Sequence, residues 1–261
     1  MSRSAYLLFD VESVPDADLL NDVKYRDMGL TPAKALALAE REAIKEYGNN
    51  FLPYTFQFPV AVAVMWLDKD FQCQRCAILP EYTTAEDEAE RIYDDEGDRL
   101  RGLVVQFWRH VEAQQLKLVS FNGRTFDLPL LELHGFKYGT TMRSHFTEKY
   151  GARYRFGDAH IDVQEFMTNF GASRLAGGLN LLSHLLGRDG KGAIAGDQVA
   201  DLYVKGEQDA INTYCLHDVL ETYCAFLRTR VLVGALARDD EAGLVSFAQQ
   251  CVAAYQPPPA P

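Results

Sequence analysis

The sequence predicts an α/β domain. Short apolar segments rich in β-branched and aromatic residues alternate with longer segments of helical periodicity, and a short polar turn joins two of the apolar segments. No internal repeat and no linker-like stretch divides the chain, so we expect one domain over residues 1–255. Residues 256–261, QPPPAP, predict a disordered tail.

The first elements follow from local signals. Residues 5–9 are an apolar run that predicts a buried strand ending on Asp10. A polar, helical insertion follows over about residues 16–57, in which Thr31 and Pro32 predict the start of a helix that Gly48 ends. The next segments, 59–68 and 71–79, predict an antiparallel hairpin with its turn at 68–70.

The second half of the chain is richer in helical patterns. It predicts one more strand and then a helix directly after it, with further helices toward the C-terminus. The expected elements are a helix over 98–115, a strand over 116–122, helices from 126 and from 160, and helices over 207–230 and 239–254.

Charge and cysteine content limit the function classes. The net charge of −11 excludes a protein that binds phosphates over its whole surface, but residues 81–98 alone carry −8 and residues 137–155 carry +4. Five cysteines do not predict a disulfide framework. No apolar stretch reaches membrane-spanning length and the N-terminus lacks targeting features, so we expect a cytoplasmic protein without a membrane partner.

Three short motifs carry acidic groups. Asp10 and Glu12 are two residues apart on a strand and therefore share a face, although strand-end acids are also common turn formers. Asp127 ends the turn Asn122-Gly-Arg-Thr-Phe-Asp127, where an acid also suits the first turn of a helix. Tyr214 and Asp218 are one helical turn apart, which is equally compatible with packing against a sheet.

Taken in order, these motifs resemble those of the DEDD 3′–5′ exonucleases, in the subclass that has tyrosine in the last motif (DEDDy). The histidine of the other subclass would fall on Thr213. The segments around Gly190-Lys191-Gly192 and Gly196-Asp197 resemble more specifically the predicted stand-alone exonucleases related to the family-B DNA polymerase editing domain. The resemblance covers most of residues 5–230 and leaves the C-terminal helix outside.

The resemblance implies an RNase H-like fold, with a mixed central β-sheet flanked by helices. It also implies a two-metal phosphodiester hydrolase that uses Mg²⁺ or Mn²⁺, because clustered carboxylates are ligands for hard cations. By resemblance, the catalytic set consists of Asp10, Glu12, Asp127, Tyr214 and Asp218, and its four carboxylates are the metal ligands.

The partner implied is single-stranded DNA or RNA with a free 3′ end. By resemblance, Ser13, Asn122 and Phe126 contact the terminal nucleotide, and Lys191 contacts a phosphate. A basic loop with Arg143, Lys149, Arg153 and Arg155 is the surface that we expect to follow the strand.

Two other functions of the same fold stay open: a nucleic-acid-binding module without catalysis, and a hydrolase of dinucleotides or short oligonucleotides. Cys73 and Cys76 have the spacing of half a zinc site, but no second pair stands at a suitable distance, so we expect core residues. Asp162 is expected to stabilise the N-terminus of a helix that His160 opens.

Overall fold

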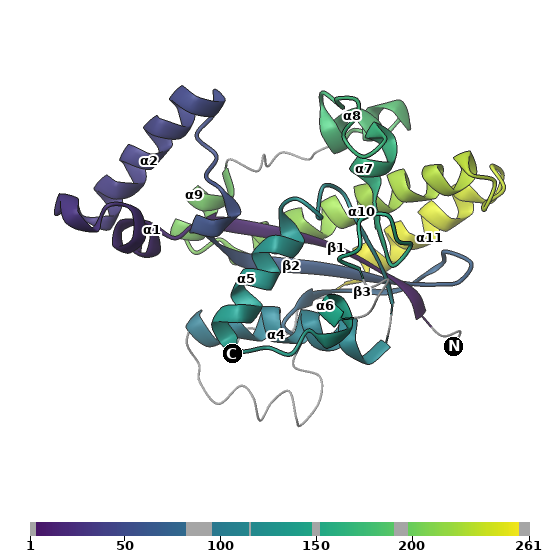
Figure 1. Ribbon diagram of the computed structural model, residues 1–261. Helices are drawn as coiled ribbons and strands as arrows, with labels where there is room; N and C mark the ends of the chain where they lie inside the picture. Colours follow the sequence, from purple (N-terminus) through teal and green to yellow (C-terminus); the bar gives the residue numbers. More distant parts are fainter. Residues whose placement is uncertain (1–3, 82–95, 115, 148–151, 191–197, 256–261) are drawn as a thin grey trace.

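The centre of the molecule is a five-stranded mixed sheet. A computed structural model describes residues 4–81, 96–114, 116–147, 152–190 and 198–255 (Figure 1). The strand order is β3-β2-β1-β4-β5, in which β1, β2 and β3 are antiparallel neighbours and β4 and β5 run parallel to β1. The strands are β1 Ser4–Pro15, β2 Gln57–Asp68, β3 Cys73–Leu79, β4 Lys117–Ser120 and β5 His160–Asp162.

Helices cover both faces of this sheet (Figure 1). On β1, Leu7, Phe9 and Val11 contribute to the core on the side of α4 and α5, whereas Leu8 contributes to the core on the side of α10. The helices are α1 Ala17–Lys24, α2 Pro32–Tyr47, α4 Glu96–Gln114, α5 Asp127–Tyr138, α6 Arg143–Thr147, α7 Val163–Thr168, α8 Gly178–Leu185, α9 Val199–Val204, α10 Gln208–Leu232 and α11 Glu241–Ala253.

The segment between β1 and β2 has a small core of its own. It contains α1 and α2, with 3₁₀ turns at Arg26–Met28 and Tyr54–Phe56. Its buried side chains are Leu20, Tyr25, Ala35, Ala39, Ala43 and Leu52. The predicted helix between Thr31 and Gly48 is confirmed, and Gly48 ends it with a left-handed φ of 79°. The extent of the domain over residues 1–255 stays a prediction.

The hairpin of β2 and β3 and the long helices α4, α5, α10 and α11 are confirmed, but two strand predictions were wrong. β1 does not end on Asp10, because β2 pairs with it as far as Pro15. His160 opens a strand and not a helix, because residues 160–162 pair with β4 and Asp162 then caps α7. The sequence of this three-residue edge strand is too short to show any periodicity.

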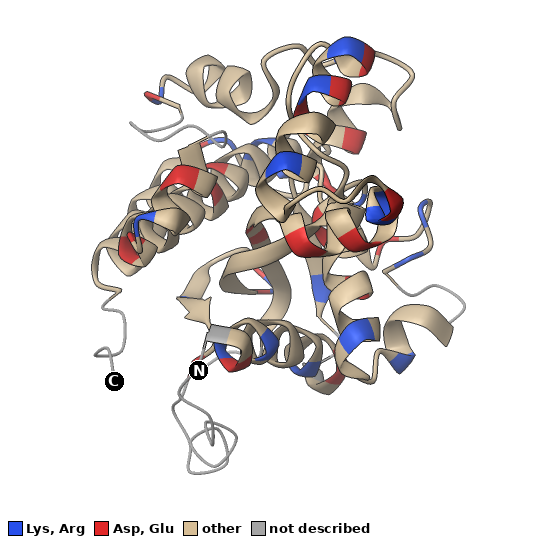
Figure 2. Cartoon of the chain, turned by 90° about the vertical axis from the view of Figure 1, so that its left-hand side faces the viewer, with Lys and Arg blue, Asp and Glu red and all other residues tan. Residues whose placement is uncertain are grey.

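Surface charge is interspersed among the described residues, with acidic and basic side chains on the same helices (Figure 2). Most of the acidic stretch 81–98 and the tail 256–261 lie outside the described residues. Among the helices described, none is both long enough and apolar enough to cross a membrane. The cytoplasmic location stays a prediction.

Candidate active site

Asp10 and Glu12 lie on the face of β1 that α10 covers. They stand opposite Ala63 and Ala61 of β2, small residues that leave room beside the carboxylates. The pairing of β1 with β4 ends at Leu8, so both acids lie past the carboxyl end of β4. Glu12 is buried and Asp10 is half-buried. The alternation predicted from the sequence is therefore confirmed, although the acids are inside the strand.

The first half of α10 brings three functional groups to this face. Cys215 Sγ lies 3.4 Å from the backbone oxygen of Asp10 and 3.7 Å from its Oδ2. One ligand atom each from Asp10, Glu12 and Cys215 lie within 4.8 Å of one another. Tyr214, the preceding residue, and Asp218, one turn later, are both buried. Residues about 200 positions apart in the chain thus form one polar cluster in the core.

The charges of this cluster act on Tyr214 and Cys215. Burial raises the pKa of the Tyr214 phenol far above its usual value, and the charges of Asp218, Glu12 and Asp10 raise it further. Burial, followed by Asp10 and Glu12, likewise raises the pKa of the Cys215 thiol well above its usual value. In the arrangement described, both groups keep their protons and act as hydrogen-bond donors.

Asp127 is attached to β1 from the side of α5, the face of the sheet opposite the one that α10 covers. It is the first residue of α5, it is buried, and its Oδ1 accepts a hydrogen bond from the backbone N–H of Val11 at 3.1 Å. Val11 stands between Asp10 and Glu12, so the α5 carboxylate is attached to the strand that carries the other two. Burial raises the pKa of Asp127 to about 7, and the charge of Asp162 contributes to this increase.

The turn before Asp127 requires its particular residues. Gly123 packs so closely on Ser120 that a Cβ atom would overlap the Ser120 hydroxyl. Asn122 has a left-handed φ of 64°, and its Oδ1 accepts hydrogen bonds from Thr125 Oγ1 at 2.6 Å and from Gln164 Nε2 at 2.8 Å. The side chain of Asn122 therefore binds within the fold, next to the position of Asp127.

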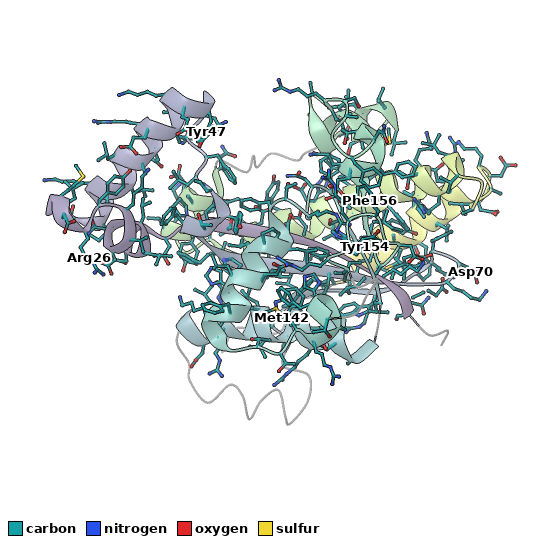
Figure 3. The ribbon with its side chains drawn as sticks, in the orientation of Figure 1. Arg26, Tyr47, Asp70, Met142, Tyr154 and Phe156 are labelled. Atoms are coloured by element: carbon teal, nitrogen blue, oxygen red, sulfur yellow. The ribbon has the colours of Figure 1, made fainter. Side chains whose placement is uncertain are left out.

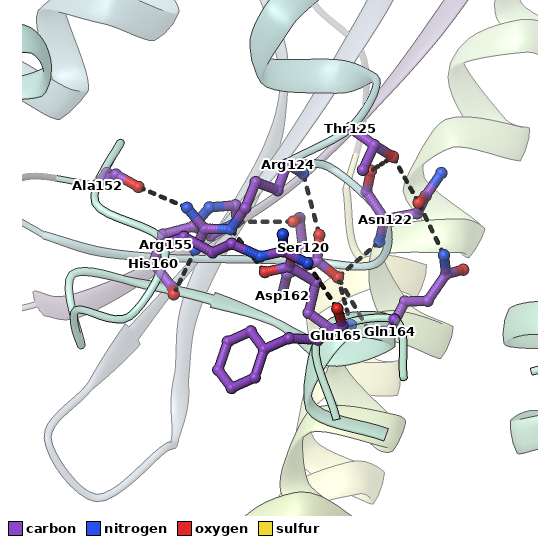
Figure 4. Close-up of polar contacts among 12 residues, drawn as sticks. Ser120, Asn122, Arg124, Thr125, Ala152, Arg155, His160, Asp162, Gln164 and Glu165 are labelled. Atoms are coloured by element: carbon purple, nitrogen blue, oxygen red, sulfur yellow. Dashed lines mark hydrogen bonds and ion pairs between the residues drawn. The ribbon is translucent and has the colours of Figure 1, made fainter. Parts of the chain in front are cut away.

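Asp162 and Arg124 fasten this turn to β5 and α7 (Figure 4). The Asp162 carboxylate accepts four backbone N–H groups, at 3.0 to 3.2 Å, from two residues of the turn and two of α7. The Arg124 guanidinium donates to Glu165 Oε2 at 2.8 Å and to the carbonyls of Ala152 and His160. We call these three side chains, Arg124, Asp162 and Glu165, the turn clamp.

The role predicted for Asp162 at a helix N-terminus is confirmed, since it is the N-cap of α7. Sequence reasoning missed the contact of Asp162 with the turn, and it missed Arg124 and Cys215. Arg124 stands inside the motif, but only the fold shows that its side chain binds Glu165 of α7 and the carbonyls of Ala152 and His160. Cys215 follows Tyr214 directly, and no spacing rule distinguishes it from the other buried cysteines.

Two more of the predicted nucleotide contacts, Ser13 and Phe126, are occupied within the chain, as Asn122 is. The Ser13 hydroxyl donates to Gln57 Oε1 at 2.6 Å. The half-buried Phe126 ring lies 5.2 Å from the exposed ring of Phe51, measured between centroids. Phe126 and Phe51 thus form an aromatic pair one residue before Asp127. Lys191 and Lys149 lie outside the described residues.

In the described part of the predicted basic loop, two of the three arginines are paired with carboxylates. Arg153 donates to both oxygens of Glu132 at 3.0 Å, and Arg155 pairs with Glu165 of the turn clamp at 2.9 Å. Arg143 is exposed on α6.

Cys73 and Cys76 are buried in β3, where the Cys76 thiol donates to the backbone oxygen of Cys251 in α11.

Family and structure comparisons agree with this arrangement. A family model described as "Predicted 3'-5' exonuclease related to the exonuclease domain of PolB" matches residues 49–258. The chain belongs to this family. The match contains Asp127, Tyr214 and Asp218, and it begins after Asp10 and Glu12. It also runs through α11, so the expectation that the C-terminal helix lies outside the resemblance was wrong.

The fold of this family member is also found in a solved polymerase. The structure of the family B DNA polymerase from the hyperthermophilic archaeon Pyrobaculum calidifontis matches 87% of this chain with a TM-score of 0.51 and 15% sequence identity. The match spans 24% of the polymerase chain. With the strand order β3-β2-β1-β4-β5, this likeness establishes the RNase H-like fold. No curated protein sequence matches the chain.

Proposed function

We propose that the chain is a metal-dependent 3′–5′ exonuclease of the DEDDy type that hydrolyses single-stranded DNA or RNA from a free 3′ end. The observation that carries this proposal is the meeting of Asp10 and Glu12 of β1 with Tyr214 of α10. The charges of both acids and of Asp218 bear on the Tyr214 phenol. A buried cluster of carboxylates is costly unless something positively charged compensates it.

The donor set fits two divalent cations with hard character, Mg²⁺ or Mn²⁺. Asp10, Glu12 and Asp218 offer oxygen atoms from two adjacent elements, and Asp127 offers a fourth carboxylate attached to β1. Asp10 would contact both ions, Glu12 and Asp218 would hold one, and Asp127 would support the other. When bound, such ions activate a water nucleophile and stabilise the leaving oxygen of a phosphodiester.

Tyr214 would position the attacking water. Burial of the side chain raises the pKa of the phenol and disfavours the phenolate, so Oη is a hydrogen-bond donor. A protonated Oη can direct a water beside Asp218 but cannot remove a proton from it. The ring itself is buried, so the side chain also holds α10 on the sheet. The chain's own residues thus supply positioning, and the Cys215 thiol fixes the backbone of Asp10.

Nucleotide contacts follow from the same arrangement. Phe126 precedes Asp127 and is half-buried, so it would stack on the terminal base with its neighbour Phe51 beside it. Ser13 and Asn122 would contact the terminal nucleotide while retaining their bonds within the fold. Lys191 is proposed for a phosphate contact.

The test is digestion of 5′-labelled single-stranded DNA and RNA with Mg²⁺ or Mn²⁺, with and without chelator. Asp10→Ala should reduce cleavage to background because it removes the ligand shared by both ions, whereas Asp70→Ala, in the exposed turn after β2, should retain full activity. Full activity of the Asp10→Ala protein would refute the proposal.

The digest also separates the two alternatives. Binding without cleavage under every metal condition would favour a silent nucleic-acid-binding module. Cleavage of dinucleotides with little cleavage of long strands would favour a hydrolase of short products. A silent binding module does not require the cluster of Tyr214 with three carboxylates, whereas a hydrolase of short products would use the same cluster and differs from the proposed exonuclease in substrate length.

A further inference from the structure

A cavity lies beside the edge strand β5, and the turn clamp bounds it on one side. Its volume is about 480 Å³, a size that accommodates a small organic ligand. Its walls come from the start of β1 and β4, the ends of α7 and α10, and the loop before β5. Arg124, Asp162 and Glu165 of the turn clamp form one wall, so the cavity adjoins the turn that precedes Asp127.

Arg230, near the end of α10, lines this cavity with an uncompensated charge. Its Nε and Nη2 donate to Thr229 Oγ1 at 3.2 and 3.1 Å. No carboxylate in the described part of the chain lies within ion-pair distance of it. The guanidinium is half-buried and lies over the rings of Phe226 and Phe166, 5.1 and 5.6 Å from their centroids. A half-buried cation without an acidic partner is suited to binding an anion.

The other cations of the cavity are already paired. Lys117 forms an ion pair with Asp158 at 2.6 Å, while Arg155 and Arg124 both pair with Glu165. Among the residues that the structure describes, Arg230 is therefore the cation of this cavity that is available to a ligand. An anionic group would enter beside it.

Exposed aromatic rings lie beside this cavity, and one of them, Phe170, belongs to a strained backbone segment. Asn169 and Phe170 have left-handed φ angles of 50° and 56°, which is uncommon for a residue as bulky as phenylalanine. Phe170 is 43% exposed and lies 5.2 Å from Phe156, which is 68% exposed. Figure 3 labels Phe156 and Tyr154, which belong to the loop before β5.

The segment at Asn169 and Phe170 is held in its conformation by Arg155 and by Glu165 of the turn clamp. Arg155 Nη2 donates to the Phe170 carbonyl at 2.7 Å, and the Phe170 N–H donates to the carbonyl of Glu165. The strained backbone is thus fixed, and the aromatic ring is left at the surface. Backbone strain at a residue whose ring is 43% exposed and contacts only Phe156 and Arg155 among the described ring contacts is typical of a binding site.

We propose that this cavity is a second binding subsite for single-stranded nucleic acid, with a phosphate at Arg230 and a base stacked on Phe170 and Phe156. An arginine beside exposed aromatic rings is the combination that recognises single strands without sequence preference. The identity of the ligand as the substrate strand rests on the proposed exonuclease function. The subsite would hold the strand upstream of the scissile 3′ end.

The experiment measures binding without turnover. Fluorescence anisotropy of a labelled oligothymidylate, in chelator, gives the affinity of the wild type and of Arg230→Gln, Phe170→Leu and Phe156→Leu. Matched controls are Arg26→Gln and Phe136→Leu, which change an exposed arginine and an exposed phenylalanine outside the cavity. We expect each cavity variant to bind roughly tenfold more weakly and both controls to bind as the wild type does.

Phe156→Leu is the variant least expected to misfold, because a ring that is 68% exposed contributes little to the core. Unchanged affinity in Phe156→Leu and in folded Arg230→Gln would overturn the subsite, even if the wild type digests strands as proposed. Weakened affinity in a protein whose wild type cleaves nothing would support the subsite and refute the exonuclease. Unchanged affinity together with a change in oligomeric mass by light scattering would assign the surface to contact between copies, and would also overturn it.

Discussion

Tyr214 and Tyr223 are both buried on α10, but their hydroxyl groups have different neighbours. Tyr223 Oη donates to the backbone carbonyl of Phe71 at 2.9 Å, an ordinary structural hydrogen bond. Tyr214, nine residues earlier on α10, faces the charges of Asp218, Glu12 and Asp10. Both rings are buried in the same core. The chemical role that we propose for Tyr214 therefore depends on the surroundings of its hydroxyl oxygen.

Tyr214→Phe should slow the chemical step by about 10²- to 10⁴-fold while folding and metal binding persist, because only the positioning hydroxyl is removed. Tyr223→Phe, the matched control, should leave the rate unchanged and lower the free energy of unfolding by about 1–3 kcal/mol, since it leaves a buried carbonyl unpaired. Single-turnover cleavage over a magnesium titration measures both rates, and chemical denaturation measures the free energy of unfolding. Complete rescue of Tyr214→Phe by excess metal would show that its hydroxyl is structural.

His160 gives the fold a pH dependence below neutrality. Burial, together with the charge of Arg124, lowers its pKa well below the usual 6.5. As the pH falls below about 6.5, the unfolded chain takes up a proton that the folded chain does not, so the free energy of unfolding falls by up to about 1.4 kcal/mol per pH unit. Burial also lowers the pKa of His134, so this residue likewise reduces the free energy of unfolding as the pH falls. Urea unfolding of wild type and His160→Gln at several pH values should give the variant a shallower slope, and parallel slopes would refute this account.

At the scale of elements, the turn from Ser120 to Asp127 illustrates what the sequence could predict. The motif predicted the turn, the helix after it and the position of Asp127, because turn and capping preferences are local. It could not predict that Asp162, about 40 residues later, would hold the backbone of the turn, since that contact depends on β5 pairing beside β4. The same limit explains β1: its continuation past Asp10 depends on β2 and not on its own residues.

Asp162→Ala should lower the free energy of unfolding by about 3 kcal/mol or more, because four backbone N–H groups, one buried and three partly buried, lose their acceptor. Asp16→Ala is the matched control. Asp16 also caps a helix, α1, but accepts a single hydrogen bond, from Leu19, so its replacement should cost about 1 kcal/mol. Chemical denaturation of both variants makes the comparison, and equal losses would show that the clamp adds nothing to the cap.

Over the whole molecule, the net charge of −11 means that a nucleic acid must be bound against a repulsive background. Long-range attraction is therefore weak, and affinity must come from a few local cations and from stacking. The ordered motifs located the carboxylates, but they could not locate these cations. Arg153 and Arg155 look equivalent in sequence, and only the fold shows that they pair with different acids, Glu132 and Glu165.

Arg143 and Arg153 test how far the basic loop contributes to binding. Replacing both with glutamine should flatten the dependence of log affinity on log salt by about 0.7 for each phosphate that the protein no longer neutralises. Arg26→Gln with Lys34→Gln removes the same charge from the α1–α2 segment and should leave the slope unchanged. Anisotropy titrations over a range of salt concentrations measure the slope. An unchanged slope in the loop variant would restrict Arg143 and Arg153 to surface ion pairing.

With Arg230 as the proposed second contact, the length of α10 would act as a ruler for the substrate. Asp218 and Arg230 stand twelve residues apart on one continuous helix, about 18 Å at the rise of an α-helix. A strand long enough to reach both ends of this ruler would stay attached between successive cleavages. Once trimming leaves a remnant shorter than the ruler, the remnant would be released and rebound for every further cut. Digestion would then proceed quickly to a fixed length of a few nucleotides and slow abruptly there.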